Sequence, residues 1–357
     1  MTETLRAFGR YCLDLRKRRA IETDWAARHR KVFRLNPGYA NPCPPEAERE
    51  HIALWRRLRS TIRTDTLRIC YNISGKLDVR TVPEEIFAWD VERCLNPGSW
   101  AKSIGHKSFY DRLYPTDIFP LSFLHRIDGV CYDPTFNVIP RESVEDVART
   151  LPYPVIIKPN WDSSGGAGVC AATSASHLLT ELASRKDCVV QETLPQHQFF
   201  RKFNPHGINS IRLYTYRSFV SGQVYILNAA LRMGKSGSLD NETAGGIVCY
   251  FDTTGRLNDY AVDKYGCKFF THPDTGIIFA KAGNIPLLDG LSDLALSLAN
   301  RTPLRVAGWD FCLDSAGRWR CLEVNVQGHT IRFSQYAGVS FFGDLTEEVI
   351  AHCATPR

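Results

Sequence analysis

The sequence predicts an α+β protein, and three kinds of pattern support that prediction. Apolar residues recur at helical spacing in 3–35 and 45–60, which is typical of amphipathic helices. The stretches 209–216 and 223–232 are rich in β-branched and aromatic residues and read as strands. Two further apolar runs flank Asp314-Ser-Ala-Gly317, which has the composition of a short hairpin loop. Helices and antiparallel strands in separate blocks of the chain are typical of the α+β class.

Composition places the chain among globular proteins. Its 357 residues are 44% hydrophobic and 23% charged, which is enough to bury a large core in two or three subdomains. The 12 cysteines include no CxxC pair, and no histidines have zinc-ligand spacing, so we expect reduced thiols. No apolar run approaches the ~20 residues of a membrane span, and the first residues lack an apolar signal core. We therefore expect a cytoplasmic protein without a membrane span.

Positive charge is concentrated in the first part of the chain. Residues 1–63 carry 15 Lys and Arg against 7 Asp and Glu, whereas the whole chain has a net charge of +6. A basic helical face can bind an anionic acceptor or partner, although it is more often the solvated side of a helix. No motif indicates a nucleic acid as that partner.

Residues 66–145 are predicted to form a small α/β unit. It begins with the strand-like run Leu67–Tyr71. A helix follows, which Pro83-Glu-Glu85 introduces and Leu95-Asn-Pro-Gly98 ends. A short strand and turn at 127–133 complete the unit.

The middle of the chain has the outline of a phosphate-binding loop. A β-branched run ends at Lys158 and leads into Ser163-Ser-Gly-Gly-Ala-Gly168. Backbone amides in a glycine-rich loop can approach a polyphosphate closely, and a nearby lysine adds positive charge. Neither GxGxxG nor a P-loop is present, and a plain glycine-rich hairpin is the alternative. The next strand brings Gln191–Leu194 beside the strand of Lys158.

Two arginines lie on the strands that follow. Arg212 and Tyr214 share one face of their strand, because side chains alternate, and Arg232 ends the next strand. Such arginines either pair with surface acids or bind an anion. The loop 240–246 then leads into a strand at 247–251.

The C-terminal hairpin presents oxygen ligands on one face. With the loop at Asp314-Ser-Ala-Gly317, Asp310 faces Cys321, and alternation puts Asp310, Glu323 and Asn325 on the same side. Asp310 and Glu323 are then diagonal neighbours, roughly 7–8 Å apart at the backbone, with room for cations between them. Hard oxygen ligands suit Mg²⁺. A surface hairpin with solvated acids is the alternative.

In this order the stretches resemble the ATP-grasp superfamily, and more narrowly the ATP-grasp proteins associated with sugar transfer and polysaccharide gene clusters. The motifs are V-I-I-K-P-N-W-D-S-S-G-G-A-G-V, V-V-Q-E, N-S-I-R-L, L-R-M-G-K-S-G-S-L-D-N-E-T-A-G-G and G-W-D-F with L-E-V-N. The resemblance implies that ATP lies between two α+β subdomains. The implied domains are a basic helical segment (1–65), a pre-ATP-grasp α/β domain (66–145), a small lid subdomain (146–200) and a large subdomain (201–357).

The resemblance also implies roles for single residues. Asp310, Glu323 and Asn325 would hold Mg²⁺, and Arg212 and Arg232 would serve the transferred phosphoryl group and an acidic substrate. The residues implied to contact the nucleotide are Lys107, Lys158, Ser163, Ser164, Gly165, Gly166, Gly168, Gln191, Glu192 and Leu194. One departure from the family pattern is His106, which precedes Lys107 where an acid or amide is expected.

The leading hypothesis is an ATP- and Mg²⁺-dependent carboxylate–amine (or thiol) ligase that acts through an acylphosphate. Its substrates would be an amino acid or small acid and a sugar-derived or peptide acceptor. A small-molecule kinase on the same fold, with a hydroxyl substrate, and a non-catalytic nucleotide-binding module are the alternatives. A kinase needs a general base, for which Asp240 and His329 are the nearest candidates.

Overall fold

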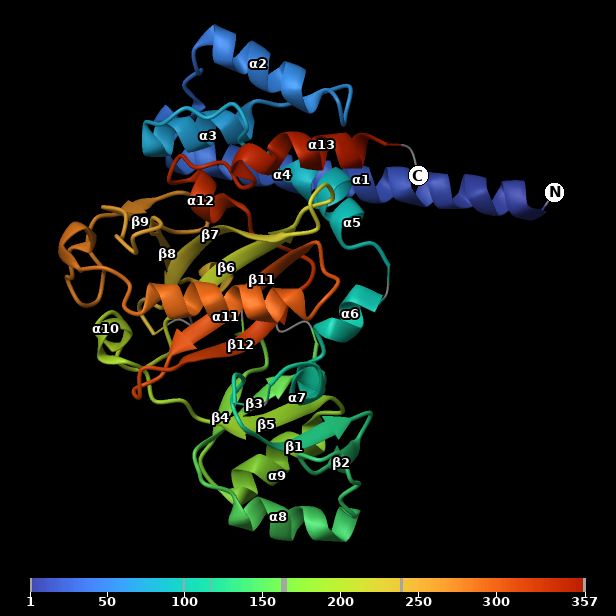
Figure 1. Ribbon diagram of the computed structural model, residues 1–357, viewed down its shortest axis with the longest axis vertical. Coiled ribbons are helices and arrows are strands. Elements are labelled where there is room, and N and C mark those ends of the chain that lie inside the picture. Colours follow the sequence, from blue (N-terminus) through green and yellow to red (C-terminus); the bar gives the residue numbers. More distant parts are fainter. Residues whose placement is uncertain (1, 99, 116, 162–165, 238–239, 356–357) are drawn as a thin grey trace.

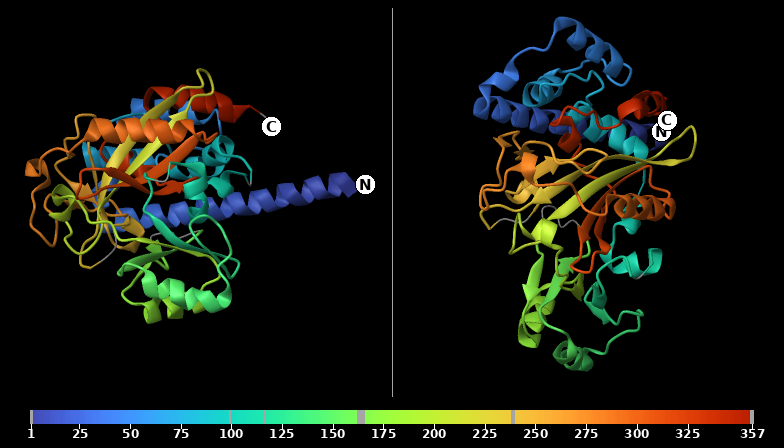
Figure 2. Two further views of the ribbon diagram at one scale, coloured as in Figure 1. Left: turned by 60° about the horizontal axis from the view of Figure 1, so that its bottom comes forward. Right: turned by 60° about the vertical axis from the view of Figure 1, so that its left-hand side comes forward.

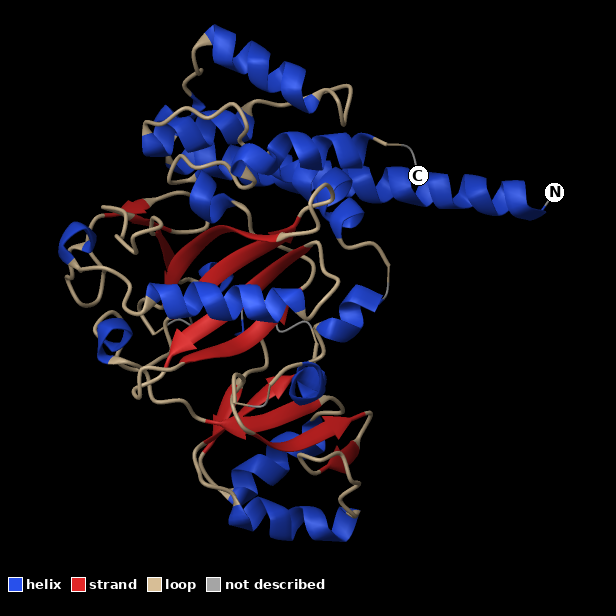
Figure 3. Cartoon of the chain, viewed as in Figure 1, coloured by secondary structure: helices blue, strands red, loops and turns tan. Residues whose placement is uncertain are grey.

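The computed structural model describes residues 2–98, 100–115, 117–161, 166–237 and 240–355. Helices lie above a large antiparallel sheet, and a small antiparallel sheet with its own helices lies below it (Figures 1 and 3). The predicted α+β class is confirmed.

The helices and strands have the following bounds. The helices are α1 (Thr2–Leu35), α2 (Pro45–Trp55), α3 (Asp65–Ser74), α4 (Glu84–Ile86), α5 (Glu92–Leu95), α6 (Trp100–Ile104), α7 (Tyr110–Leu113), α8 (Val144–Thr150), α9 (Ala175–Ser184), α10 (Gln198–Arg201), α11 (Leu288–Asn300), α12 (Arg332–Gln335) and α13 (Thr346–Ala354). The strands are β1 (Ser122–Ile127), β2 (Val130–Tyr132), β3 (Val155–Pro159), β4 (Cys170–Ala172), β5 (Cys188–Glu192), β6 (Ser210–Arg217), β7 (Val224–Met233), β8 (Ile247–Tyr250), β9 (Ala261–Val262), β10 (Lys268–Phe269), β11 (Val306–Leu313) and β12 (Trp319–Asn325).

The helical layer covers one face of the large sheet. Its largest buried side chains, among them Trp55 and Phe87, pack in one apolar cluster with Tyr214 and Tyr216 of β6. The N-terminal turns of α1 project beyond the rest of the molecule (Figures 1 and 2). Within the described residues, no helix combines the length and the apolar character that crossing a membrane requires.

The strand predicted at Leu67–Tyr71 is wrong, because this run lies inside helix α3. The buried residues of α3 include Thr66, Ile69, Cys70 and Ile73, which follow one another at helical spacing. The apparent alternation of Leu67, Ile69 and Tyr71 was too short to separate a strand from a helix. The other elements described between α3 and Leu113 are also helical.

In the described part of the chain, the small sheet has five strands in the order β2-β1-β5-β3-β4. β3 pairs antiparallel with β5, so that Lys158 lies opposite Val189 and Ile156 opposite Gln191. This confirms the prediction that the strand of Gln191 lies beside the strand of Lys158. β1 and β2, which come from the segment 66–145, belong to this sheet.

The large sheet has seven strands among the described residues, in the order β10-β9-β8-β7-β6-β11-β12. Its second face packs against α11, and Trp309 and Phe311 of β11 are fully buried there. The predicted hairpin of β11 and β12 is confirmed. Its predicted register is wrong. Next to the turn, Leu313 faces Trp319 rather than Arg318, and a bulge next to Asp310 adds a second residue, so that Glu323 rather than Cys321 lies opposite Asp310.

A buried ion cluster joins the helical layer to the large subdomain. Arg332 donates to Glu84 at 2.9 Å and also to Glu242, and these three charged side chains are 3–4% exposed. His29 of α1 lies 3.7 Å from the carboxylate of Glu84 and 3.6 Å from that of Asp65. Burial alone would lower the pKa of His29, but the two carboxylates outweigh it and raise the pKa to about 9. Helix α1 is therefore part of the packed structure.

The thiols fit the prediction of a reduced protein. All 12 cysteines lie among the described residues, and no disulfide joins any of them there.

Candidate active site

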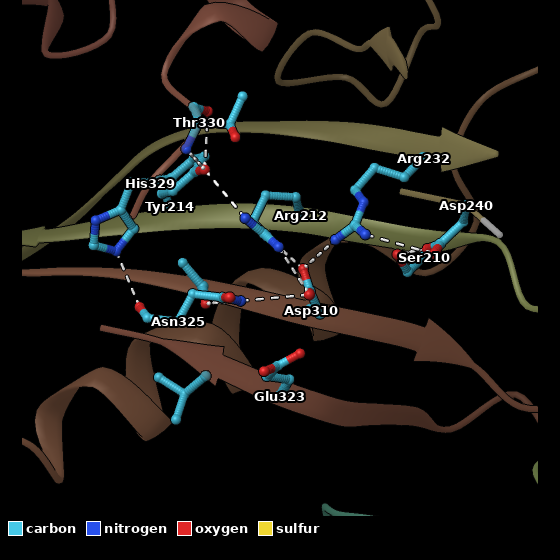
Figure 4. Close-up of polar contacts among 12 residues, drawn as sticks. Ser210, Arg212, Tyr214, Arg232, Asp240, Asp310, Glu323, Asn325, His329 and Thr330 are labelled. Carbon is cyan, nitrogen blue, oxygen red and sulfur yellow. Dashed lines mark hydrogen bonds and ion pairs between the residues drawn. The ribbon is translucent and has the colours of Figure 1, made fainter. Parts of the chain in front are cut away.

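Two arginines of the large sheet converge on one aspartate (Figure 4). Arg212 of β6 donates to both carboxylate oxygens of Asp310, and the distance from Nη2 to Oδ2 is 2.9 Å. Arg232 of β7 donates Nη1 to Oδ1 of the same carboxylate at 2.9 Å. These strands are neighbours in the order β7-β6-β11, and Asp310 lies directly opposite Arg212, so side chains on the shared face meet.

The side chains of this group of charges are buried. The three side chains are 6–8% exposed. Burial alone would raise the pKa of Asp310, but the two guanidiniums outweigh it and hold that pKa below its usual range. Burial also opposes the charge of Arg212, and Asp310 outweighs it, so the pKa of Arg212 is raised. The group is therefore ionised at neutral pH.

The loop after β7 adds a second carboxylate. Asp240 lies 3.5 Å from Nη2 of Arg232 and accepts a hydrogen bond from the hydroxyl of Ser210. Burial raises the pKa of Asp240 more than Arg232 lowers it. Gly246 allows the loop to close, since a Cβ there would lie 2.6 Å from the carbonyl oxygen of Asp240.

The hairpin places the other two predicted metal ligands next to Asp310. Asn325 donates Nδ2 to the carbonyl oxygen of Gly308 at 3.1 Å and to Oδ2 of Asp310 at 3.4 Å. Glu323 pairs across the hairpin with Asp310, and its side chain is 28% exposed. The bulge therefore brings the two carboxylates closer than the predicted diagonal arrangement.

This donor set fits Mg²⁺. Two carboxylates and one amide oxygen are hard donors, and they lie on one face of a hairpin that is held in place by its strand pairing. No group of three or more His, Cys, Asp or Glu able to hold a metal occurs in the described residues, so the set depends on the amide of Asn325.

Two lysines lie beside the hairpin. Lys107 is buried and donates Nζ to Oε1 of Glu323 at 2.7 Å, a contact that joins the 3₁₀ helix Lys107–Phe109 to the hairpin. Lys158, at the end of β3, is half-buried. Burial lowers the pKa of Lys158, and the nearby charge of Lys107 lowers it further. Two cations that repel each other form a favourable place for a polyanion.

The glycine-rich loop is described only in part. Gly166 and Gly168 adopt φ values of +78° and +73°, a backbone conformation that glycine takes without strain. The predicted nucleotide contacts Ser163, Ser164 and Gly165 lie outside the described residues.

The predicted adenine-side hinge lies at the end of β5. Gln191 is buried and donates Nε2 to the carbonyl oxygen of Pro120 at 3.2 Å. Glu192 accepts a hydrogen bond from the backbone N–H of Leu121 at 2.9 Å and an ion pair from Arg320 at 2.8 Å. The predicted hinge is therefore tied to both sheets. Leu194, two residues further on, is 7% exposed.

Sequence reasoning missed the partner of His329. Glu92 of α5 accepts from the backbone N–H of His329 at 2.8 Å and lies 2.6 Å from ring Nδ1. Ring Nε2 lies 3.0 Å from the carbonyl oxygen of Asn325. The two residues of this pair are 237 positions apart, so no local pattern could have indicated it.

These features define an ATP-grasp fold, in which a small antiparallel sheet that bears Lys158 lies next to a large antiparallel sheet that bears the carboxylates. A sequence model described as sugar-transfer associated ATP-grasp matches residues 89–348. The chain belongs to this family. Among curated proteins, none matches the chain.

Solved structures of ATP-grasp proteins are similar to the chain at low identity. The ATP-grasp ligase PsnB complexed with a minimal precursor is 17% identical, with a TM-score of 0.40 over 72% of this chain and 64% of that chain. N5-carboxyaminoimidazole synthase from Aspergillus clavatus is 10% identical, with a TM-score of 0.40 over 67% and 51%. The biotin carboxylase domain of the Hydrogenobacter thermophilus 2-oxoglutarate carboxylase is 13% identical, with a TM-score of 0.40 over 72% and 46%. The chain spans less than two thirds of the length of each.

Proposed function

We propose that this chain is an ATP- and Mg²⁺-dependent ligase. It activates a small carboxylic acid or amino acid as an acylphosphate and joins it to an amine or thiol of a sugar-derived or peptide acceptor. The observation that carries the proposal is the pair of buried arginines, Arg212 and Arg232, on the same sheet face as Asp310 and Glu323. Membership of an ATP-grasp family supports ATP as the phosphoryl donor.

The nucleotide would lie between the two sheets. Lys107 and Lys158 would neutralise its phosphates, and the glycine-rich loop would cover them. Gln191, Glu192 and Leu194 would border the adenine. The position of Lys158 near the charge of Lys107 supports this placement, because a bound polyphosphate would offset both positive charges.

Asp310, Glu323 and Asn325 would hold Mg²⁺, which when bound supplies positive charge to the transferring phosphoryl group. Arg212 and Arg232 would orient the substrate carboxylate and offset the negative charge of the phosphoryl group. A guanidinium suits both tasks, because it binds carboxylate and phosphate in the same bidentate way.

The reaction then has two steps. A carboxylate oxygen of the acid attacks the γ-phosphorus, and the bond to the β-phosphate oxygen breaks, so that ADP leaves. The amine or thiol next attacks the acyl carbon, inorganic phosphate leaves, and the attacking group loses one proton. Positioning and electrostatic stabilisation are the main contributions of the protein to the first step.

The environment of the two candidate bases supports a ligase over a kinase. An alcohol nucleophile needs a base that can accept its proton. Asp240 already interacts with Arg232 and Ser210, and the ring nitrogens of His329 face Glu92 and Asn325. A carboxylate nucleophile needs no such base at neutral pH.

Hydroxylamine trapping tests the proposal. The full chain is incubated with MgATP, hydroxylamine and each of a panel of amino acids and small acids. For the correct acid, a hydroxamate forms together with equal amounts of ADP and phosphate. Lys186→Ala serves as a control, because Lys186 is an exposed lysine outside the site.

Two outcomes contradict the ligase. A stable phosphorylated alcohol without any hydroxamate moves the assignment to a kinase and makes Asp240 the next residue to replace. ATP binding without turnover across acids, alcohols and amines supports a non-catalytic nucleotide-binding module.

A further inference from the structure

A cavity of about 600 Å³ lies beside the segment that leaves the candidate active site. Its lining residues come from α1, from α5 and the chain that follows it, and from the loop after β12. They are Lys17, Glu92, Arg93, Gly98, Lys102, Gln327 and Gly328. Helices α1, α5 and α6 lie along one edge of the molecule in Figure 1.

Positive charge dominates this cavity. Three of the lining side chains, those of Lys17, Arg93 and Lys102, are cationic and exposed, and each belongs to a different segment. The one lining carboxylate is that of Glu92, which His329 already engages through both its backbone N–H and its ring. The three lining cations outnumber this carboxylate, so the lining residues carry a net positive charge.

Arg93 is held at the cavity by its surroundings. Its guanidinium lies 3.9 Å from the ring centre of Trp89 and 3.6 Å from the carboxylate of Asp14. Both charged side chains of the Arg93 and Asp14 pair are 50% exposed, so the pair is a weak competitor for a bound anion.

A π turn and two side-chain hydrogen bonds fix the backbone around the cavity. A π turn at Phe87–Val91 immediately precedes Glu92 and Arg93, and such turns widen a helix and redirect the residues that follow. The buried amide of Asn96 donates to the carbonyl oxygens of Val306 and Val326 at 2.6 and 2.9 Å. The helix that bears Arg93 is therefore fastened to the strands that carry Asp310 and Asn325.

The cavity also lies close to the proposed chemistry along the chain. Gln327 and Gly328 follow Asn325 by two and three residues, and His329 contacts the carbonyl oxygen of Asn325 at 3.0 Å. The loop that lines the cavity is thus continuous with the strand that bears Glu323 and Asn325.

We propose that this cavity binds a phosphate group of the acceptor substrate. The inference rests on the proposed ligase function, since it names the class of acceptor that the same enzyme would use. Three cations drawn from three segments match a dianionic phosphate better than a single carboxylate charge. In this proposal Lys17 is the basic residue of the first helix that contacts the phosphate group.

Calorimetric titration of inorganic phosphate tests the proposal. The full chain is first saturated with MgADP, so that the nucleotide site is filled, and phosphate is then titrated at low salt. The test variant is Lys17→Gln/Lys102→Gln, and the matched control is Lys186→Gln/Lys281→Gln, which removes two exposed lysines outside the cavity. We expect the test variant to bind phosphate about tenfold more weakly, and the control to bind like the unmodified protein.

Salt gives a second measurement. Binding to the unmodified protein should weaken between low and physiological ionic strength, because the exposed cations are screened. Equal phosphate affinity in the test and control variants overturns the proposal, and so does the absence of phosphate binding to the unmodified protein.

The outcome for the cavity is separable from that for the ligase. If MgATP fails to raise the melting temperature of the unmodified protein while phosphate binding still depends on Lys17 and Lys102, the ligase proposal fails and the cavity remains an anion site. If MgATP binds and hydroxamate forms, but phosphate affinity is the same in both variants, only the cavity proposal fails.

Discussion

Two buried ion clusters in this chain both pair arginines with carboxylates, but they differ in their access to solvent. In the first, Arg212 and Arg232 share Asp310, and the neighbouring Glu323 is 28% exposed. In the second, Arg332 joins Glu84 and Glu242, and every charged atom group of the three is 3–4% exposed.

The difference indicates separate roles. The first cluster adjoins half-buried groups, Glu323 and Lys158, through which a ligand can approach the buried arginines. The three side chains of the second cluster are all almost fully buried, and they connect the helical layer to the loop that carries Asp240. In a buried cluster of this kind, the loss of one charged side chain destabilises the fold, because its partner is left as an uncompensated charge away from water. We therefore expect changes in the sealed cluster to affect stability, and changes in the open one to affect ligands and turnover.

The largest effect is expected at the sealed cluster. Arg332→Leu removes the cation that Glu84 and Glu242 share and leaves His29 beside Glu84, which should lower the free energy of unfolding by about 3–5 kcal/mol. Urea denaturation measures the change. Arg149→Ala, at an ion pair whose arginine is 63% exposed, should change stability by less than about 0.5 kcal/mol. Equal effects of the two substitutions would contradict the comparison.

In the open cluster, Glu323→Gln should lower Mg²⁺-dependent ATP turnover at least ~100-fold, because an oxygen ligand loses its charge. The melting temperature should stay close to that of the unmodified protein, since the side chain is partly exposed. Glu347→Gln, at an exposed ion pair on α13, is the matched control. Near-normal turnover of Glu323→Gln at saturating Mg²⁺ would sink the metal assignment.

The nucleotide interaction should disappear with one lysine. MgATP at about 100 times its dissociation constant should stabilise the unmodified protein by about 2.7 kcal/mol, seen as a higher melting temperature. Lys158→Ala should remove most of this shift, and Lys281→Ala, an exposed lysine elsewhere, should retain it. A full shift in Lys158→Ala would show that Lys158 has a structural role.

The smallest effect concerns pH and His29 of the sealed cluster. The folded pKa of about 9 exceeds the ordinary value of 6.5, so the folded state binds the proton more tightly. The stabilisation is complete below pH 6.5 and is lost as the pH rises toward 9, and about 2 kcal/mol of it is lost between pH 6.5 and 8.5. The stability of His29→Gln should fall less than that of the unmodified protein between pH 6.5 and 8.5. Parallel curves for the two proteins would contradict the assignment.

Local patterns in the sequence were sufficient for the hairpin and its neighbours. The turn residues Asp314-Ser-Ala-Gly317 and the two apolar runs beside them depend only on residues close in the chain, and the structure confirms the hairpin that they predict. The strand prediction at Leu67–Tyr71 was wrong because it also relied on a few neighbouring residues. So short a run fits the spacing of a strand as well as that of a helix, and packing selects one of them.

The register of the hairpin could not be predicted from the alternation of side chains alone. Alternation put Asp310, Glu323 and Asn325 on one face, but it could not place the bulge that sets Glu323 opposite Asp310. A bulge adds one residue to one strand at little local cost, so its position depends on how the whole sheet packs.

The sequence alone determined the order of the motifs, the chemical types at the candidate site and the family to which the chain belongs. Only the tertiary structure decided that Lys107 pairs with Glu323, 216 residues away, and that Glu92 engages His329. It also decided that α1 is fastened to the core through His29, and that its Lys17 lines the cavity near Asn325. Local propensity acts over a few residues, whereas these contacts form only when helices and sheets are packed against each other, and that packing brings distant segments together.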